Sequence, residues 1–336
     1  MIYDILIVGA GISAATISAI LGKKKKICVI DTRDHIGGNC YDYLEDDMYI
    51  HKYGPHIFHS GNKKIVDFLS QYTIFNPYEH SVFAEINFND KLIRVPFPYS
   101  KETTKVLGRE LEHTEIIEYF FRGYSEKMWG CEWDNLPPEI TGRIPQQNLE
   151  TSNYFPGEFV GLPDRGYSTM MEKMFKDVDV FLNADEDEWH TISAENILYC
   201  GRMDRILLNE EKRVQDLYHE LPYRTLNIVP TNKKSHGVVL NICHQLDDAI
   251  RYVNYGPLNE VLARMIFAEY PIAAKKDDIE PFYPIPFDEN KILYIKCYNI
   301  VREEFDNLIP MGRLGNYMYL DMDEAVERAI QIAKDI

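Results

Sequence analysis

Hydrophobic and polar positions repeat along the chain with periods that predict strands and helices. The apolar, β-branched runs at residues 5–8 and 27–30 are typical of buried parallel strands. Residues 11–21 between them predict a helix, and the lysines at 23–26 place positive charge near its C-terminal end. The chain is therefore predicted to begin with a strand–helix–strand unit of a parallel α/β sheet.

The patterns beyond this unit predict both kinds of element. Alternation at residues 81–86 and 92–95, separated by a turn-like stretch, indicates an antiparallel hairpin. Residues 101–130 are predicted to be helical, with 109–115 as a solvated face or a short connection. Further helices are predicted at 63–72 and 323–333, and further strands at 178–183, 196–201, 238–243 and 292–298. No linker or repeat separates these elements, so we expect interwoven subdomains.

The turn after the first strand has the sequence Gly-x-Gly-x-x-Ala. Gly9 permits its backbone conformation, Gly11 lets the main chain approach a pyrophosphate, and Ala14 keeps the helix close to the sheet. Asp31 ends the second strand, at a spacing that suits a carboxylate binding ribose hydroxyls. A lone glycine turn also occurs in ordinary βα connections, but the complete order of strand, turn, helix, strand and acid predicts a dinucleotide site.

A second glycine pair, Gly37 and Gly38, follows the acid. It lets another stretch of backbone approach an extended cofactor, which an NAD-binding domain does not usually need, so the pattern favours FAD over NAD. The sequence lacks a nucleophile elbow, a zinc-protease helix motif and a P-loop. We therefore expect the chemistry to belong to the flavin.

Composition excludes several other classes of protein. The 336 residues suffice for two or three subdomains, and their formal net charge of −17 argues against a nucleic-acid partner. Six cysteines lie apart without a Cys-x-x-Cys pair, so neither a disulfide framework nor a zinc site is expected. No bound metal is expected either. Because no apolar run is long enough to span a membrane, we expect a soluble, cytoplasmic protein.

Histidines and aromatic residues gather in a few segments. His51, His56 and His59 lie in a loop-rich stretch around Gly54, and their spacing does not fit a closed metal site. Each is either a structural histidine or a contact to a cofactor ring. Four aromatic residues are either core residues or ligand contacts, namely Tyr124, Trp129, Tyr317 and Tyr319.

Several separate motifs resemble those of the bacterial UDP-galactopyranose mutases, in the order of that family and over nearly the full length of the chain. They are Gly9 to Ala14, His35 to Asn39, His51 to His59, Gly123 to Gly130, Asn153 to Phe155, Pro281 to Pro284 and Gly312 to Met322. The resemblance implies an α/β fold in which a Rossmann-like FAD-binding domain carries an inserted small helical subdomain and an antiparallel β-sheet subdomain. The implied boundaries are 1–76, 190–225 and 296–336 for the FAD-binding domain, 77–100, 156–189 and 226–295 for the sheet that binds substrate, and 101–155 for the helical subdomain with a mobile lid.

The resemblance also implies an activity. An FAD-dependent isomerase would interconvert the pyranose and furanose forms of a nucleotide sugar, most simply UDP-galactopyranose and UDP-galactofuranose, without net redox change. N5 of the reduced flavin attacks the anomeric carbon in this family, so an external reductant is needed. Three alternatives stay open: a mutase for another nucleotide sugar such as UDP-arabinopyranose, a flavin amine-oxidase-like oxidoreductase, and a nucleotide-sugar-binding relative without turnover.

Positions that match the family's motifs acquire roles from the resemblance. Catalytic roles are implied for His56, His59, Arg251, Tyr283, Arg313 and Tyr319. Substrate binding is implied for Phe120, Tyr124, Trp129, Asn153, Tyr154, Arg251, Tyr283 and Tyr319, with Tyr124 stacking on the base. FAD binding is implied for Gly9, Gly11, Ile12, Ser13, Asp31, Thr32, Arg33, Gly38, Asn39, His56, Ile57, Arg313, Asp321 and Met322.

Two features depart from the family pattern. An arginine usually follows the Arg-Ile-Pro element on the lid, but here Gln146 and Gln147 follow Pro145. Either another cation substitutes for it, with Arg165 and Lys127 as candidates, or the lid and the substrate differ from those of the family. The chain is also shorter than its relatives before Tyr124, in the region that commonly forms the dimer. A homodimer is therefore possible, but weakened.

Overall fold

The first layer of the molecule is a five-stranded parallel sheet. In the computed structural model, which describes residues 2–142, 149–208, 221–233, 235, 237–261, 265–274 and 281–336, its order is β10–β2–β1–β11–β17. These strands are β1 (Tyr3–Val8), β2 (Ile27–Ile30), β10 (Asp179–Phe181), β11 (Ala194–Tyr199) and β17 (Leu308–Pro310). All four residues of β2 are buried, as expected for a parallel strand covered on both faces.

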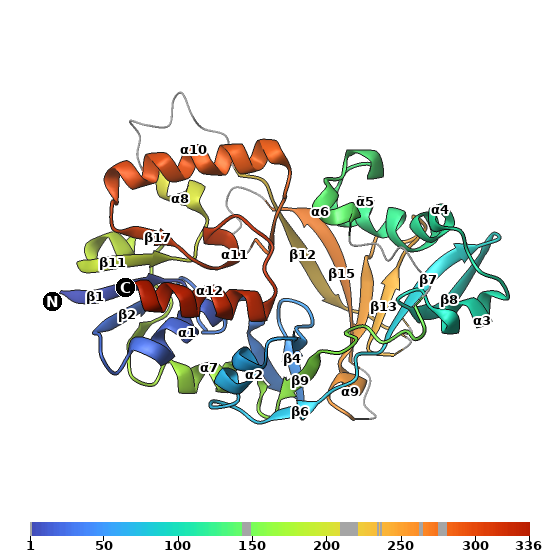
Figure 1. The fold of residues 1–336 in the computed structure, drawn as a ribbon, viewed down its shortest axis with the longest axis horizontal. Helices are drawn as coiled ribbons and strands as arrows, with labels where there is room; N and C mark the ends of the chain where they lie inside the picture. Colours follow the sequence, from blue (N-terminus) through green and yellow to red (C-terminus); the bar gives the residue numbers. More distant parts are fainter. Residues whose placement is uncertain are drawn as a thin grey trace.

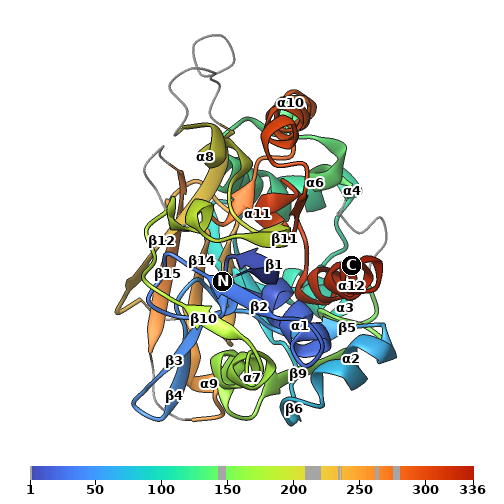
Figure 2. The ribbon, with the colours of Figure 1, turned by 90° about the vertical axis from the view of Figure 1, so that its left-hand side faces the viewer.

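Helices cover both faces of this sheet (Figures 1 and 2). One face packs against α1 (Ile12–Leu21), α7 (Gly166–Met174) and α12 (Met322–Asp335), and the other against α8 (Met203–Leu208) and α10 (Asp288–Glu304). Successive side chains of β1 alternate between the two cores, because Ile5 and Ile7 join the α1 side whereas Leu6 joins the α8 side. The expected Rossmann-like layer is confirmed.

A second, seven-stranded sheet forms the other lobe of the molecule (Figure 1). Its order is β16–β12–β15–β14–β13–β7–β8, and every pair is antiparallel except β13 with β7. The strands are β7 (Val82–Phe88), β8 (Lys91–Phe97), β12 (Tyr223–Pro230), β13 (Val239–Ile242), β14 (Arg251–Asn254), β15 (Ile266–Ala273) and β16 (Tyr283–Pro284). The predicted hairpin at 81–95 is β7 with β8.

Short helical elements follow this hairpin, and those at 101–107, 117–122 and 123–129 pack against the sheet. They are α3 (Lys101–Leu107), α4 (His113–Ile116), a π-helical turn (Ile117–Arg122), α5 (Gly123–Trp129) and α6 (Pro138–Thr141). The predicted helix at 101–130 is therefore interrupted, and residues 109–112 are a connection. Gly108 ends α3 in the left-handed conformation, with φ of 76°, and a capping box at Glu112 starts α4.

The remaining elements lie between the two lobes or at turns. Two small sheets are β3 (Asp42–Glu45) with β4 (Met48–His51), and β5 (Phe58–Ser60) with β9 (Phe159–Pro163) and β6 (Phe75–Pro77). Short helices are α2 (Lys63–Leu69), α9 (Tyr255–Leu258), α11 (Gly312–Gly315) and 3₁₀ turns at Gly38–Cys40, Trp133–Asn135 and Glu188–Thr191. None of the helices in the described ranges is long and apolar enough to cross a membrane.

Two sequence predictions are wrong. Residues 292–298 were expected to form a strand, but they lie in α10, where Leu293, Cys297 and Val301 recur every four residues and face one core. Residues 179–181 were assigned to the antiparallel sheet, but β10 pairs with β2 in the parallel one. Part of the predicted loop at 51–59 also belongs to β4 and β5.

Candidate functional site

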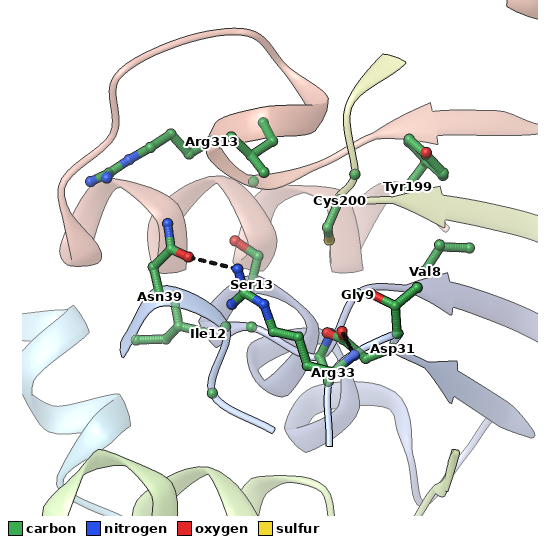
Figure 3. Close-up of a pocket in the computed structure, with 18 of the residues that line it drawn as sticks. Val8, Gly9, Ile12, Ser13, Asp31, Arg33, Asn39, Tyr199, Cys200 and Arg313 are labelled. Carbon is green, nitrogen blue, oxygen red and sulfur yellow. Dashed lines mark hydrogen bonds between the residues drawn. The ribbon is translucent and has the colours of Figure 1, made fainter. Parts of the chain in front are cut away.

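A deep cavity opens at the carboxyl ends of β1, β2 and β11. Its floor is the glycine turn between β1 and α1, and its walls come from the ends of β2 and β11, the Gly37 segment and the segment around α11 (Figure 3). In an open parallel sheet, the carboxyl ends of the strands are where ligands bind. We call this space the cofactor cavity.

Glycines shape the cofactor cavity by close approach of backbone segments. Gly9 has φ of 108°, and a Cβ there would lie 2.8 Å from the Cβ of Cys200. A Cβ on Gly38 would lie 2.9 Å from the Cα of Gly11. Gly11 also caps α1 without a side-chain hydrogen bond, which leaves the first N–H groups of the helix available to an anion. The cradle is therefore built for a phosphate-bearing ligand.

Asp31 holds the turn and the following segment together. Its Oδ2 accepts a hydrogen bond from the backbone N–H of Ala10 at 2.6 Å, and its Oδ1 accepts one from the N–H of Arg33 at 2.9 Å. The guanidinium of Arg33 donates to Oδ1 of Asn39 at 3.1 Å, as Figure 3 shows. Each oxygen of a carboxylate can accept more than one hydrogen bond, so Asp31 can still bind a hydroxyl.

The structure brings nearly all the residues expected to bind cofactor into this one cavity. Its lining includes Gly9, Gly11, Ile12, Ser13, Asp31, Thr32, Arg33, Gly38, Asn39, His56, Arg313, Asp321 and Met322. Ile57 does not line the cavity, because it is buried in the core of the other lobe. Sequence reasoning missed the wall formed by Asp185, Glu186, Cys200, Arg202 and Arg205. Its one sequence signal was the buried strand that ends at Gly201.

His56 lies where the cofactor cavity meets a second group of predicted residues. Its Nδ1 donates to the carbonyl of Gly54 at 2.8 Å, which leaves Nε2 as an acceptor. Burial lowers the pKa of His56 to about 3, and the charges of Arg313 and Arg251 act in the same direction. His56 is therefore neutral at physiological pH, with its proton on Nδ1.

His51 holds the backbone of His56 in place and does not line the cofactor cavity. Its Nδ1 accepts the backbone N–H of His56 at 2.9 Å, and its ring packs edge-on against Tyr167 and Tyr255. Burial lowers the pKa of His51 to about 4. His51 is thus the structural histidine among the three.

His59 lies apart from the cofactor cavity, on β5. Its Nδ1 pairs with Glu158 at 2.7 Å and its ring stacks on Phe155 at a centroid distance of 3.9 Å. Sequence reasoning missed His80, whose ring lies 5.3 Å from that of Tyr154. Burial lowers the pKa of His80 to about 4, and the charges of Arg251 and His59 add to this effect. His80 is therefore close enough to Arg251 for the charge of that guanidinium to act on it.

Arg313 connects the cofactor cavity to a pair of tyrosines. Its guanidinium donates to the carbonyl of Leu320 at 2.6 Å and lies 5.1 and 4.8 Å from the ring centroids of Tyr283 and Tyr319. The two tyrosine rings are nearly parallel, with centroids 6.0 Å apart. We call Arg251, Tyr283, Arg313 and Tyr319 the arginine–tyrosine cluster.

Arg251, at the start of β14, forms a buried ion pair with Glu269 of β15. Its Nε donates to Oε2 of Glu269, which is fully buried. Burial opposes the charge of Arg251, but the carboxylate of Glu269 outweighs it and raises the pKa of Arg251. In the part of the chain that the structure describes, the two terminal nitrogens of Arg251 make no hydrogen bond, so they can bind an anion.

The loop before His56 packs directly on this ion pair. A Cβ on Gly54, whose φ is 90°, would lie 3.1 Å from Oε1 of Glu269 and 3.6 Å from a terminal nitrogen of Arg251. Oε1 has no hydrogen-bond partner among the described residues. We call residues 51–56 the histidine loop. This loop and the arginine–tyrosine cluster are therefore in contact.

Tyr124 and Trp129 lie on α5 and pack beside Tyr283 against a small core of Tyr53, Met128, Leu226, Ile250 and Phe282. Burial raises the pKa of Tyr124, and the charges of Arg251 and Glu269 are close enough to affect it. Both aromatic residues are half-buried, so each keeps part of its ring open to a ligand.

Other predicted substrate contacts are less favourably placed. Phe120 is 2% exposed and packs between Phe97 and Tyr99 in the core, so its ring is not available to a ligand. Asn153 is exposed, and Tyr154 is 36% exposed and packs against Phe155. Among the described residues no group of His, Cys, Asp or Glu side chains is arranged to hold a metal ion.

The two candidate replacements for the lid arginine lie in different surroundings. Lys127 donates hydrogen bonds to four backbone carbonyls, so its N–H groups are already used. Arg165 is exposed beside α7, on the parallel-sheet lobe. Gln146 and Gln147, and the Arg-Ile-Pro element before them, lie outside the described residues.

Comparison with known proteins identifies the family. Residues 119–319 match the sequence profile of UDP-galactopyranose mutase, and residues 7–72 match an NAD(P)-binding Rossmann-like domain. The chain belongs to the UDP-galactopyranose mutase family. It is thus an isomerase of the nucleotide-sugar pyranose–furanose mutase type, as the motifs predicted, and members of this family are flavoproteins.

Relatives in the UDP-galactopyranose mutase family differ in substrate. The chain is 28% identical to a probable UDP-galactopyranose mutase of Klebsiella pneumoniae, over 99% of this chain and 94% of that protein. It is 27% identical to a dTDP-fucopyranose mutase of Escherichia coli, over 98% and 97%. A crystal structure of reduced UDP-galactopyranose mutase superposes with a TM-score of 0.68 and 14% identity, over 99% of this chain and 93% of that one, which confirms the fold.

Proposed function

We propose that the protein is an FAD-dependent isomerase that interconverts the pyranose and furanose forms of a nucleotide sugar, with UDP-galactopyranose as the first candidate. One observation carries this proposal. The cofactor cavity and the arginine–tyrosine cluster adjoin at His56 and Arg313, so a ligand in the cavity would lie beside a site for an anion. A dinucleotide and a nucleotide sugar would then meet there.

The residues present fit FAD. The positions where Gly9 and Gly38 exclude a Cβ and the uncapped N-terminus of α1 suit a diphosphate, and Asp31 suits a ribose. Arg313, which belongs to the arginine–tyrosine cluster, and His56 line one end of the cavity. When bound and reduced by an external reductant, FAD supplies the nucleophile for the anomeric carbon.

Binding of the diphosphate is assigned to Arg251 and the two tyrosines. The terminal nitrogens of Arg251 can donate to phosphate oxygens, and Glu269 fixes the orientation of the guanidinium from behind. The hydroxyls of Tyr283 and Tyr319 can donate to the same anion, because their rings are stacked side by side under Arg313. This arrangement would stabilise the nucleoside diphosphate as a leaving group.

The base and the sugar are assigned to the aromatic side of the site. Tyr124 offers a ring face for a pyrimidine, and Trp129, five residues further along α5, offers an apolar wall for the sugar. His56 presents an acceptor at Nε2 while holding its proton at Nδ1. Contacts of this kind orient the sugar and exclude water from the reacting centre.

A substrate panel tests the proposal. Purified protein is loaded with FAD, reduced with dithionite and incubated separately with UDP-galactopyranose, UDP-arabinopyranose and dTDP-fucopyranose, and the products are separated by chromatography. We expect a furanose product, formed fastest from UDP-galactopyranose. In a parallel assay without dithionite, in air and with amines as substrates, peroxide release would instead indicate an oxidoreductase. Nucleotide binding without any product would indicate a binding protein.

A further inference from the structure

Helix α5 is the last part of a continuous helical segment, residues 113–129, which begins with α4 and passes through the π-helical turn. Its seven residues, Gly123–Trp129, carry both aromatic residues assigned to the nucleotide sugar. Most of the stability of a helix in a protein comes from tertiary packing, so contacts with the sheet determine where this end of the segment lies. The contacts that hold α5 therefore also determine where Tyr124 and Trp129 lie.

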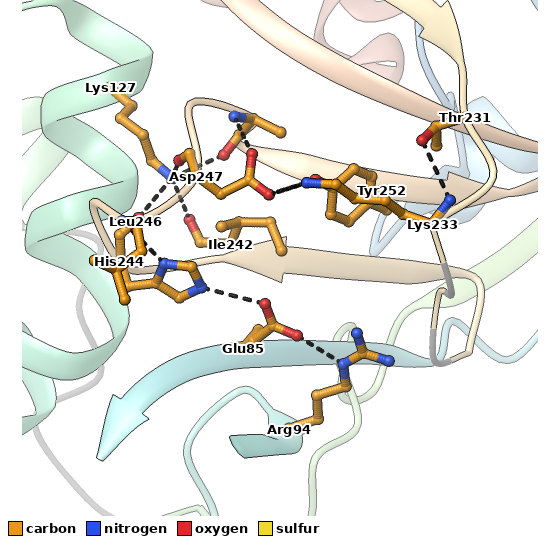
Figure 4. Close-up of polar contacts among 11 residues, drawn as sticks. Glu85, Arg94, Lys127, Thr231, Lys233, Ile242, His244, Leu246, Asp247 and Tyr252 are labelled. Atoms are coloured by element: carbon orange, nitrogen blue, oxygen red, sulfur yellow. Dashed lines mark hydrogen bonds and ion pairs between the residues drawn. The ribbon is translucent and has the colours of Figure 1, made fainter. Parts of the chain in front are cut away.

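Lys127 makes the most concentrated of these contacts (Figure 4). Its ammonium donates to the carbonyl oxygens of Ile242, His244 and Asp247, each at 2.9 Å, and of Ala249 at 2.7 Å. An ammonium has three N–H groups, so four carbonyls saturate it. All four acceptors belong to one segment, residues 242–249, which joins β13 to β14. We call it the β13–β14 segment.

The N-terminal end of α5 also lies against the β13–β14 segment. A Cβ on Gly123 would lie 2.4 Å from the carbonyl oxygen of Cys243, a separation that no larger residue tolerates without a backbone shift. Gln245 reaches back and donates to Oε2 of Glu126 at 3.1 Å. Lys127 thus holds a close backbone contact that the sequence of α5 permits only through glycine.

A second buried cation holds the other end of α5 to the sheet. Arg224 of β12 donates from Nε to the carbonyl of Met128 at 2.8 Å, and from a terminal nitrogen to the carbonyl of Lys127 at 3.1 Å. Only 8% of Arg224 is exposed. A cation at the last carbonyls of a helix is favourably placed, so α5 is fixed at its C-terminus independently of Lys127.

The β13–β14 segment leads directly into Arg251, the first residue of β14. Lys127 therefore joins the helix that carries Tyr124 and Trp129 to the backbone that carries the arginine. We propose that Lys127 is a positioning residue of the nucleotide-sugar site, which fixes the distance between the aromatic residues of α5 and Arg251. The inference rests on the proposed function for the identity of the ligand.

The surroundings of Lys127 support this role. Burial lowers the pKa of Lys127 to about 8, while the carboxylates of Asp247 and Asp248 act in the opposite direction. Burying a charged group costs free energy unless hydrogen bonds compensate for it. The four hydrogen bonds to carbonyl groups therefore account for the position of Lys127 in this buried environment. Lys127 touches neither the cofactor cavity nor the arginine–tyrosine cluster in the described residues, so it acts through α5.

Replacement by methionine tests the proposal, with a matched control on the same segment. Lys127→Met removes the ammonium, whereas Lys233→Met removes another lysine that contacts the β13–β14 segment, at Asp247, without reaching α5. UDP binding to the FAD-loaded proteins is measured by calorimetry. We expect Lys127→Met to lose about tenfold or more in affinity and Lys233→Met to change by about twofold or less.

Further measurements exclude a general loss of folding. We expect Lys127→Met to retain its bound FAD and flavin spectrum, and to raise KM for the nucleotide sugar more than it lowers kcat. Lys127→Gln, which keeps two N–H donors, should show a smaller loss of UDP affinity. Equal losses in the Lys127→Met and Lys233→Met variants, or unchanged UDP affinity in a folded Lys127→Met protein, would overturn the proposal.

Failure of the proposed function gives a different pattern. If the wild-type protein bound neither UDP nor dTDP, the assignment of the ligand would be wrong. Hydrogen exchange would still test Lys127 in that case. We expect amides at 123–130 and 243–250 to exchange faster in Lys127→Met than in Lys233→Met, and equal rates in the two variants would contradict the positioning role.

Discussion

The cofactor cavity and the arginine–tyrosine cluster adjoin, but they are built in different ways. The cavity is formed largely by backbone, where glycines such as Gly9 and Gly38 let segments approach closely. The cluster is formed by side chains, and its central arginine is fixed by an ion pair with the buried Glu269. A cavity of the first kind depends on steric fit, whereas a cluster of the second kind depends on balanced charge. Mutations should therefore damage the two regions through different physical effects.

Loss of balanced charge should have the greatest effect. Arg251→Met leaves the carboxylate of Glu269 buried and unpaired, and breaking a buried ion pair in this way costs about 3 to 5 kcal/mol. Urea unfolding of the FAD-free protein measures this cost. UDP affinity should fall as well, while FAD still binds. Unchanged stability would show that Glu269 takes up a proton without penalty.

Steric crowding in the cavity should have the next largest effect. Gly9→Ala places a Cβ 2.8 Å from Cys200 and forces a residue with φ of 108° to carry a side chain, at a cost of about 1 to 3 kcal/mol. FAD content after purification should fall sharply, with UDP binding less affected. Gly108→Ala is the matched control, because Gly108 also has positive φ but nothing lies within 4 Å of its Cβ position. Similar FAD loss in both variants would mean that strain alone is responsible.

Acid should weaken the histidine loop that joins the two regions. In the folded protein the pKa values of His51 and His56 are about 4 and about 3, below the usual value of 6.5. Between the lowered pKa of each histidine and pH 6.5, the unfolded chain therefore binds protons that the folded chain does not. Stability should therefore fall as pH falls from 7 to 5.5, by about 1.4 kcal/mol per pH unit for each histidine below pH 6.5. Urea unfolding at both pH values measures this slope. His51→Gln should reduce it, and an unchanged slope would contradict the assignment.

A partly exposed ion pair in the same sheet should matter least. Arg94 pairs with Glu85 at 2.7 Å, and 31% of the Arg94 side chain and 14% of the Glu85 side chain are exposed. Without Arg94, the carboxylate of Glu85 would still pair with His244, at 3.2 Å. Arg94→Met should change the free energy of unfolding by about 1 kcal/mol or less, because solvent screens such pairs. A loss as large as that of Arg251→Met would show that burial does not distinguish the two ion pairs.

The same difference explains what the sequence predicted. The cofactor cavity depends on a contiguous pattern, from Gly9 to Asn39. The hydrophobic periodicity and the glycine spacing of this one segment are enough to predict the geometry of the cavity. Arg251 and Tyr283 were named only through the family resemblance, because no local pattern marks them. Glu269 was missed, since its importance arises from burial next to Arg251, which only the folded sheet creates. His80 was missed because its burial is also a product of the fold and not of the local sequence.

Errors in the sequence interpretation have equally physical causes. The segment at 292–298 has apolar residues close together, and only the four-residue spacing of Leu293, Cys297 and Val301 distinguishes its helix from a strand. Lys127 looked like a free cation for phosphate, but long-range folding supplies four carbonyls that occupy it. Contacts between segments more than a hundred residues apart are beyond the reach of periodicity.

The dependence of turnover on the redox state of bound flavin tests the proposed reaction most directly. Protein loaded with FAD is divided into a dithionite-reduced and an air-oxidised sample, and furanose formation from UDP-galactopyranose, or from the best substrate of the panel, is followed by chromatography. We predict many turnovers in the reduced sample, without consumption of reductant, and no turnover in the oxidised sample. Equal rates in both samples, or one reductant consumed per product, would contradict an isomerase that uses reduced FAD beside the arginine–tyrosine cluster.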